Sequence, residues 1–298
     1  MTNADGTPVP LQRRTVRVRG RTVAYLAAGE GPTLVFLHGW GLSHSSYRAA
    51  LRRPAEAGLR VLAPAMPGFG GTADLPASEL SLGGYARWLL DFLAAVGQHD
   101  PVTLVGHSFG GGVAIRAAHD APARVSRLVL VNSIGGSTWT EAGGVVKALR
   151  ERPIWDWGLH LRADVLPLRQ ITRVVPVILQ DATVNVLRNP GAVWRVAYLA
   201  RTADLRGELA ELKRRRLPVV VVWGRQDRVL PQASLAALRL ALGDPEVVTV
   251  NGNHSWLIRD PRSFGEVITN VLGIGATAPA ASSGPPGDAD LDPLEERA

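Results

Sequence analysis

The sequence predicts an α/β protein with a mostly parallel sheet, helices on both faces of that sheet, and a helical insertion between two of its strands. Short apolar runs of strand length alternate with helical stretches, as in a parallel sheet that is buried on both sides. This alternation stops near residue 135 and resumes after residue 216. Of the 298 residues, 46% are hydrophobic, which is enough for a sizeable core.

The expected strands are short and the expected helices amphipathic. Residues 15–19 and 22–27 alternate in polarity like two paired strands with a turn at Gly20. Residues 81–96 show the clearest helical periodicity, and Ser81 is a plausible N-cap. Further strands are predicted over residues 33–37, 60–63, 102–105, 127–131, 218–223 and 246–250. Further helices are predicted over residues 45–57, 111–119, 232–242 and 262–272.

The pattern divides the chain into three parts. Residues 1–134 and 217–274 form the predicted core, and residues 135–216 form the predicted helical cap. Residues 275–298 consist largely of Ala, Pro, Gly, Ser and Asp, which predicts a disordered tail.

Composition narrows the classes of function. The chain has no cysteine, which excludes disulfides, a thiol nucleophile and cysteine-ligated zinc. The formal charge of +7 comes almost entirely from scattered arginines, with Lys147 and Lys213 as the only lysines. No basic motif interleaved with aromatic residues is present, so nucleic-acid binding is not predicted. No apolar run approaches the roughly 18 residues of a membrane helix, and no secretory leader is visible. We therefore expect a soluble cytoplasmic protein.

The strongest catalytic signal is Gly106-His107-Ser108-Phe109-Gly110, a G-x-S-x-G sequence between an apolar strand and a helix rich in small residues. A serine on such a tight turn has a strained backbone. Larger side chains two residues away on either side would collide. The turn lifts the hydroxyl off the sheet to a helix N-terminus, where the positive end of the helix dipole favours a developing anion. Ser108 is the predicted nucleophile.

A serine nucleophile needs a base, and the base needs an orienting carboxylate. Asp227 and His254 each follow an apolar strand, and the chain order Ser108, Asp227, His254 is the order this kind of site uses. Asp204 and Asp260 remain alternatives to Asp227. The histidines that compete for the role of base, and that fit surface or core positions better, are His44, His99, His119 and His160.

An oxyanion hole needs two backbone N–H groups that point at one oxygen. Phe109, directly after the predicted nucleophile, supplies one of them. The loop after residues 33–37 supplies the other, with Trp40 N–H as the candidate donor and Gly39 allowing close approach of the backbone. The His38 side chain is expected to brace this loop through hydrogen bonds and not to transfer protons.

In combination and in order, these motifs resemble the α/β-hydrolase fold superfamily over most of residues 15–272. The resemblance implies an eight-stranded, mostly parallel sheet with a helical cap over the catalytic face and no metal or cofactor. The segments that carry it are His38-Gly39-Trp40-Gly41, Met66-Pro67-Gly68-Phe69-Gly70, residues 106–111, residues 224–227 with Pro231, and Gly252-Asn253-His254.

Within this superfamily, Ser108 argues against epoxide hydrolases and haloalkane dehalogenases, which carry aspartate at the nucleophile position. The loop at residues 38–42 with residues 67–70 is similar to microbial small-ester carboxylesterases, including the methyl ester esterase that acts on pimeloyl groups held by acyl carrier protein. Carbon–carbon bond hydrolases and haloperoxidase-like perhydrolases remain open. A ligand-binding or signalling protein on the same scaffold is the alternative of another class.

The expected partner is a small molecule with an apolar acyl or alcohol part, because tryptophans in the predicted cap suggest an apolar pocket. The same residues suit a small core within the cap. The cap also carries more Lys and Arg than Asp and Glu, which would steer an acidic acyl carrier protein. Arginine enrichment along the whole chain explains this charge more simply.

Overall fold

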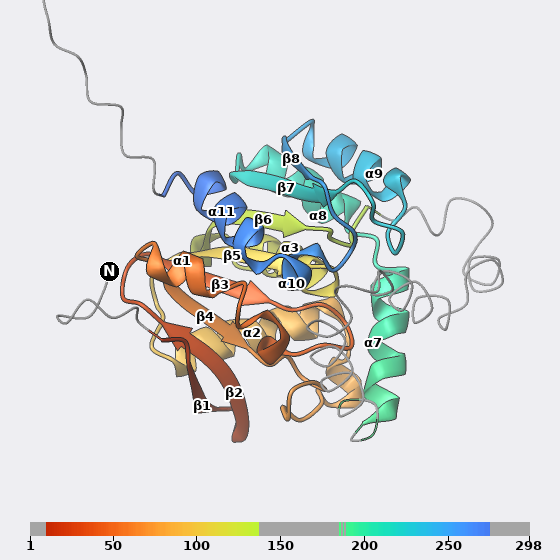
Figure 1. Cartoon of the computed structure of the whole chain (residues 1–298). Helices are drawn as coiled ribbons and strands as arrows, with labels where there is room; N and C mark the ends of the chain where they lie inside the picture. Colours follow the sequence, from red (N-terminus) through yellow and green to blue (C-terminus); the bar gives the residue numbers. More distant parts are fainter. Residues whose placement is uncertain (1–9, 137–184, 186, 188, 275–298) are drawn as a thin grey trace, which may run out of the picture.

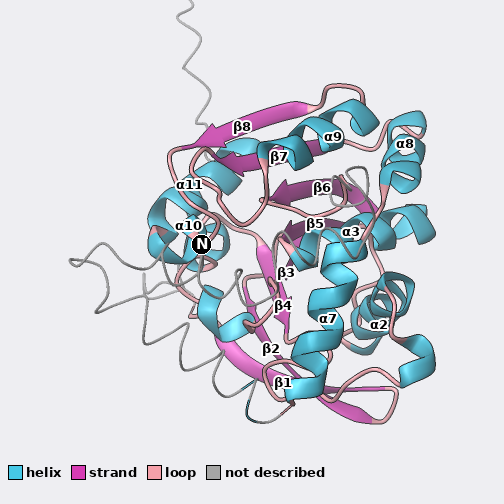
Figure 2. Ribbon diagram, turned by 90° about the vertical axis from the view of Figure 1, so that its right-hand side faces the viewer, coloured by secondary structure: helices cyan, strands magenta, loops and turns pink. Residues whose placement is uncertain are grey.

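The computed structural model describes residues 10–136, 185, 187 and 189–274. Three layers make up this part of the chain: one sheet and a layer of helices on each of its faces (Figures 1 and 2). The predicted tail and most of the predicted cap lie outside the described residues.

The eight-stranded sheet has the order β1-β2-β4-β3-β5-β6-β7-β8. β2 is antiparallel to β1 and β4, and every other neighbouring pair is parallel. The expected mostly parallel, eight-stranded sheet is therefore confirmed. The strands are β1 (Gln12–Val18), β2 (Arg21–Ala28), β3 (Thr33–Leu37), β4 (Arg60–Pro64), β5 (Val102–His107), β6 (Val125–Val131), β7 (Val219–Gly224) and β8 (Glu246–Val250).

Each face of the sheet has its own apolar core, because alternate strand residues point to opposite sides. In β3, Val35 and Leu37 pack with α2, α3, α8 and α9, whereas Leu34 and Phe36 pack with α1, α10 and α11. The helices are α1 (Arg52–Glu56), α2 (Leu82–Ala95), α3 (Phe109–Asp120), α7 (Pro190–Thr202), α8 (Arg206–Arg214), α9 (Gln232–Leu242), α10 (Trp256–Arg259) and α11 (Pro261–Val271), with short 3-10 turns η1 (His44–Tyr47), η2 (Ala77–Glu79) and η3 (Pro122–Arg124).

One expected helix is wrong in extent. Residues 45–57 form the turn η1 and the five-residue helix α1 (Arg52–Glu56) instead of one continuous helix. Pro54 explains the late start of α1, because proline lacks an N–H and is tolerated only in the first turn of a helix. The short helix α10 was not expected at all.

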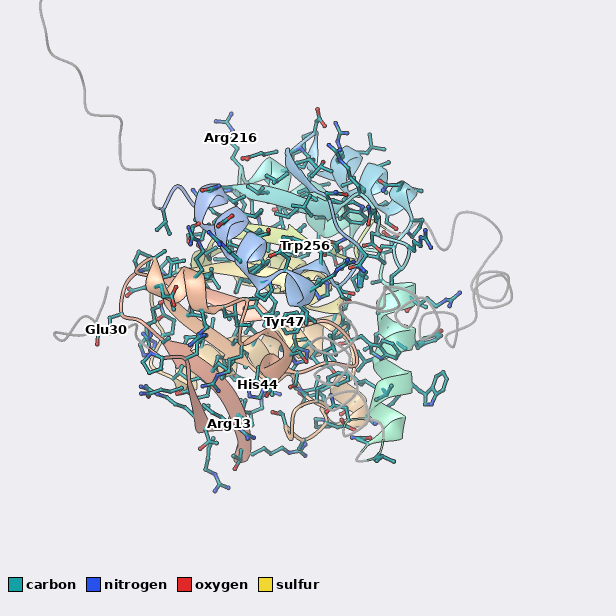
Figure 3. The ribbon with its side chains drawn as sticks, in the orientation of Figure 1. Arg13, Glu30, His44, Tyr47, Arg216 and Trp256 are labelled. Atoms are coloured by element: carbon teal, nitrogen blue, oxygen red, sulfur yellow. The ribbon has the colours of Figure 1, made fainter. Side chains whose placement is uncertain are left out.

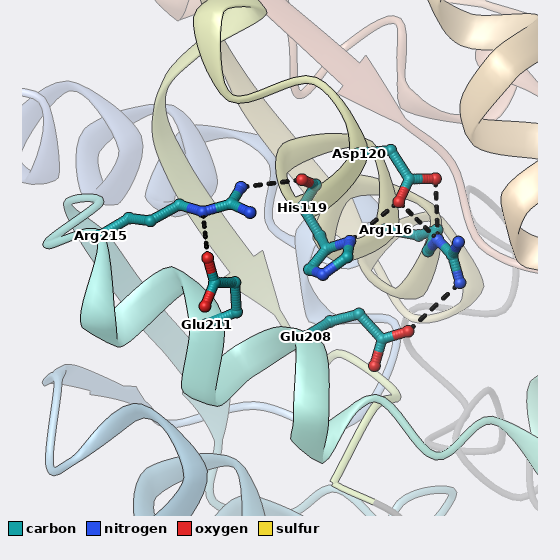
Figure 4. A network of polar contacts seen from close by, with 6 residues as sticks. All are labelled: Arg116, His119, Asp120, Glu208, Glu211 and Arg215. Atoms are coloured by element: carbon teal, nitrogen blue, oxygen red, sulfur yellow. Dashed lines mark hydrogen bonds and ion pairs between the residues drawn. The ribbon is translucent and has the colours of Figure 1, made fainter.

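The helix α8, which lies inside the range predicted for the cap, packs against α3 and α9. Figure 4 shows the polar contacts between α3 and α8, where Arg116 pairs with Glu208 and Arg215 donates to the carbonyl of His119. The division between core and cap stays a prediction, since most of residues 135–216 lie outside the described part.

Candidate active site

Six loops leave the sheet at the same edge, because parallel strands end on the same side. These loops follow β3, β4, β5, β6, β7 and β8. In open α/β sheets, ligands bind at this carboxyl edge. The predicted site residues Trp40, Ser108, Asp227 and His254 lie on four of these loops.

Ser108 lies between β5 and α3 with φ 52° and ψ −117°, a conformation that non-glycine residues rarely adopt. Its N–H donates to Val131 O, and its carbonyl accepts from Gly111 N and Ile134 N. The neighbouring strand β6 and the segment after it therefore hold the turn. The strained turn expected at Ser108 is present.

The two glycines of the motif are required by close packing. A Cβ at Gly106 would lie 2.5 Å from the Gly111 Cα, and a Cβ at Gly110 would lie 2.3 Å from the carbonyl oxygen of Leu37. Any larger side chain at either position would push the first turn of α3 away from β3 and β5. The sequence-based steric argument is confirmed at both positions.

Asp227 and His254 are joined by a direct hydrogen bond of 2.8 Å between Asp227 Oδ2 and His254 Nδ1. An ionised carboxylate only accepts, so Nδ1 carries the proton and Nε2 is left with its lone pair. Asp227 Oδ1 accepts from the N–H groups of Val229 and Leu230. Burial raises the pKa of the Asp227 carboxyl, but the attraction of His254 and the hydrogen bonds that the carboxylate accepts outweigh it. The pKa of Asp227 therefore lies below its ordinary value, which keeps the group ionised.

Asn132 is a site residue that the sequence analysis missed. It directly follows β6, is fully buried, and has a left-handed φ of 42°. Its side-chain N–H donates to Asp227 Oδ2, and its Oδ1 accepts from Trp256 Nε1 at 3.0 Å. Because these two contacts fix both ends of the amide, Asn132 holds the carboxylate in place. The available signal was its position, as a polar residue directly after an apolar strand.

Ser108 is connected to His254 through its neighbour. His107 Nε2 lies 3.0 Å from the carbonyl oxygen of His254, and the two imidazole rings lie 5.0 Å apart. Within the described part of the chain, no hydrogen bond joins Ser108 Oγ to His254 Nε2. Catalytic hydrogen bonds are often long without substrate and shorten in the complex.

The loop at residues 38–41 is held as expected. His38 Nε2 accepts from Met66 N–H at 2.9 Å, so His38 Nδ1 is protonated and donates to the carbonyl of Gly39. His38 therefore braces the loop. On the other side of the site, Phe109 is the first residue of α3, where a backbone N–H has no acceptor within the helix.

The segment around α7 contacts this loop from outside. Trp40 Nε1 donates to the carbonyl of Val193 at 2.7 Å. Asn185, which is buried, accepts from Gly70 N–H and donates to the carbonyl of Gly41. The loop that carries Trp40 is thus in contact with a segment more than 140 residues later in the chain.

The alternative site residues have other roles. Asp204 pairs with Arg206, and Asp260 caps α11 by accepting from Ser263 N–H. His119 contacts Asp120 on the surface of α3 (Figure 4). His160 lies outside the described residues. None of these observations competes with the pairing of Asp227 and His254.

A cleft of about 790 Å³ lies between the loop after β8 and α11. Its walls include Gln226, Asn251 and Trp256, but neither Ser108 nor His254. Trp256 thus both lines this cleft and donates to Asn132. In the described part of the chain, we find no cluster of three side chains suited to hold a metal ion and no helix long and apolar enough to cross a membrane.

Comparison with known proteins identifies the family and supports the fold. Residues 34–267 match the Alpha/beta hydrolase family, so the chain belongs to that family. It is 30% identical over 289 residues to an uncharacterized protein of Mycobacterium tuberculosis, covering 90% of this chain and 82% of the relative. It is also 30% identical over 268 residues to the pimeloyl-[acyl-carrier protein] methyl ester esterase of Aeromonas hydrophila, covering 82% and 97%. The bromoperoxidase of Bacillus anthracis has a similar fold, with a TM-score of 0.72 over 88% of this chain and 100% of that one, at 18% identity.

Proposed function

We propose that the protein is a serine hydrolase that cleaves the carboxylic ester of a small, largely apolar substrate through an acyl-enzyme. The observation that supports this most directly is the buried hydrogen bond between Asp227 and His254, at the same sheet edge as the strained Ser108 turn. The carboxylate of Asp227 accepts from Nδ1 and so holds the proton of the neutral imidazole on that nitrogen. Nε2 is then unprotonated on the other side of the ring, as a general base requires.

In the proposed reaction, Ser108 Oγ attacks the ester carbonyl carbon while His254 Nε2 takes the hydroxyl proton. The N–H groups of Trp40 and Phe109 stabilise the oxyanion. Collapse of the intermediate breaks the bond to the alcohol, which leaves with the proton from His254, and the acyl group stays on Ser108. Water then gives a proton to His254 and attacks the acyl-enzyme. The acid leaves, and Ser108 regains its proton. Asp227 stabilises the charged imidazole in both halves.

Two further features bear on the substrate. The half-buried indole of Trp40 lies beside α7, which provides apolar surface near the loop. Similarity to the pimeloyl-[acyl-carrier protein] esterase makes a methyl ester on an acidic carrier protein a candidate substrate. We keep the small free ester as the first choice. The cytoplasmic location, the absence of a cofactor and the cap at residues 135–216 remain parts of this proposal.

The test is a panel of chromogenic esters of increasing acyl length, together with a thioester, a cleavable diketone, a peracid assay and a methyl ester on acyl carrier protein. Ser108→Ala should lower kcat by about 10⁴-fold or more against the best ester. Ser133→Ala is the matched control, because Ser133 is a buried serine one strand away whose hydroxyl donates to Ile134 O. It should keep activity within a few-fold.

The outcomes separate the alternatives. Ester turnover that survives Ser108→Ala would exclude this mechanism. Cleavage of the diketone, or formation of a peracid, in place of ester hydrolysis would leave the roles of Ser108, Asp227 and His254 unchanged and would change the class of reaction. No turnover across the panel, with tight binding of a ligand, would favour a binding or signalling protein.

A further inference from the structure

A chain of buried hydrogen bonds connects three loops of the candidate site. The chain starts at Gly39 N–H, which donates to the Tyr47 hydroxyl at 3.2 Å. The Tyr47 hydroxyl lies 2.9 Å from His107 Nδ1, and His107 Nε2 lies 3.0 Å from the carbonyl oxygen of His254. Tyr47 is completely buried, and it lies toward the middle of the molecule in Figure 3. We call these four groups the buried polar chain.

The direction of each hydrogen bond follows from chemistry. The carbonyl of His254 can only accept, so His107 Nε2 carries the proton of the ring. Burial lowers the pKa of His107 to about 3, which leaves the ring neutral and Nδ1 unprotonated. Nδ1 therefore accepts from the Tyr47 hydroxyl, whose oxygen in turn accepts from Gly39 N–H. Every donor in the buried polar chain has an acceptor.

The loops that the buried polar chain connects carry the proposed oxyanion donor, the proposed nucleophile and the proposed base. Gly39 precedes Trp40, the proposed oxyanion donor, while His107 precedes Ser108. His254 is the proposed base. Packing between the first two loops is tight, because a Cβ on Gly39 would lie 2.9 Å from His107 Nδ1 and 3.3 Å from the Tyr47 hydroxyl. The position of the Gly39 backbone is therefore set by the Tyr47 hydroxyl and the His107 ring.

We propose that Tyr47 is a positioning residue, whose hydroxyl sets the oxyanion loop at residues 38–41 in register with the nucleophile turn and with the loop of the base. This proposal rests on the proposed function, since it assigns a role within the same site. Tyr47 does not contact substrate. It acts through Gly39 N–H on one side and through His107 on the other. Without its hydroxyl, the Trp40 N–H would no longer be held at hydrogen-bonding distance from the developing oxyanion.

The test compares two buried tyrosines. Tyr47→Phe removes one hydroxyl from the buried polar chain. Tyr85→Phe is the matched control, because the Tyr85 hydroxyl is also buried but donates to Pro67 O at 3.0 Å and not to a residue of the loop at 38–41. Both variants, wild type and Ser108→Ala are assayed with the best ester, at least 15 °C below each melting temperature.

We expect Tyr47→Phe to lower kcat by about 10- to 100-fold with little change in KM, since loss of one oxyanion donor costs about 10²- to 10³-fold and this variant only displaces one. Its affinity for a trifluoromethyl ketone, which forms a tetrahedral adduct with serine, should fall by a similar factor. Tyr85→Phe should stay within about threefold of wild type. A mainly structural role would lower the melting temperature of both variants and leave both kcat values alike.

Equal kcat values for Tyr47→Phe and Tyr85→Phe would overturn the positioning role while leaving the hydrolase proposal intact. Activity that persists in Ser108→Ala would overturn the hydrolase proposal itself. If Tyr47→Phe does not fold, nitrogen NMR of wild-type protein with labelled histidines shows which ring nitrogen of His107 carries the proton. His107 should be a neutral ring protonated at Nε2, and a ring protonated at Nδ1 would overturn the proposal, because it could not accept from Tyr47.

Discussion

The loop at residues 38–41 is held from two sides that differ in their access to water. On the inner side, Gly39 meets the fully buried Tyr47 and His107. On the outer side, Trp40 and Gly41 meet Val193 and Asn185 through contacts that are only partly buried. Both sides use a few ordinary hydrogen bonds, but only on the outer side can water replace a bond that is lost.

This difference separates two kinds of effect. A buried polar group without a partner costs about 1–3 kcal/mol, because neither protein nor water satisfies it. A partly buried group that loses its partner finds water, and the net cost is smaller. We therefore expect inner changes to affect folding and catalysis together, and outer changes to affect mainly catalysis.

The largest effect is expected from His107→Leu. This change leaves the Tyr47 hydroxyl without its acceptor and the His254 carbonyl without its donor, so the free energy of unfolding should fall by about 2–5 kcal/mol. Urea unfolding at pH 7.5 measures it. His107→Gln is the control, because its amide offers one acceptor and one donor, and it should lose less than half as much. Equal losses for Leu and Gln would show that ring packing, and not hydrogen bonding, is what His107 contributes.

The pH dependence of the free energy of unfolding gives a second, smaller effect of the inner contacts. In the folded protein His107 stays neutral down to a pKa of about 3, whereas in the unfolded chain histidine takes up a proton below about pH 6.5. The unfolded state then binds more protons, so the free energy of unfolding falls by roughly 1 kcal/mol per pH unit as pH drops below 6.5. Above pH 6.5 the contribution of His107 to stability is fully present.

Urea unfolding of wild type and His107→Gln at pH 7.5, 6.5, 5.5 and 4.5 tests this slope. The advantage of wild type should shrink steadily below pH 6.5, because glutamine does not titrate. Asp227, with its lowered pKa in the folded protein, adds a loss of the same sign, but only below about pH 4, where aspartate in the unfolded chain takes up a proton. Parallel curves for the two proteins over this range would mean that His107 is protonated in the folded state.

A second contrast, between local and distant features of the chain, explains what the sequence could predict. The Ser108 turn and the two loops that carry Asp227 and His254 are local features, each made of residues adjacent to a strand end. Sterics and chain order alone indicated them. The strand order of the sheet is not local, because each parallel crossover could have placed its strand on either side of the one before.

The missed residues also depend on distant partners. Tyr47 lies in a stretch predicted as helix, and nothing near it in the sequence indicates that its hydroxyl meets a histidine 60 residues later. Asn132 is bonded to Asp227, 95 residues away, and Asn185 to Gly41, 144 residues earlier. The hydrogen bonds of these three side chains form between loops that are distant in the sequence and that lie together only in the folded sheet.

A small effect on stability, and the clearest test of the outer side, is expected from Asn185→Ala. The change removes the contacts with Gly41 O and Gly70 N–H, which are partly buried and can be replaced by water. The free energy of unfolding should fall by only about 1 kcal/mol. Because Gly41 follows Trp40, kcat/KM for the best ester should still fall about 5- to 20-fold, as when one oxyanion donor is displaced and not deleted.

The control for this prediction is Arg195→Ala, which breaks a contact of the helix α7 that follows Asn185, without touching residues 38–41. Arg195 pairs with Asp74 at 2.7 Å, and its side chain is 49% exposed, so the pair should contribute well under about 1 kcal/mol. Activity should stay within about twofold of wild type. If Arg195→Ala lowered kcat/KM as much as Asn185→Ala, the placement of α7 as a whole would be what matters. If neither variant changed kcat/KM, the inner contacts alone would suffice to hold the oxyanion loop.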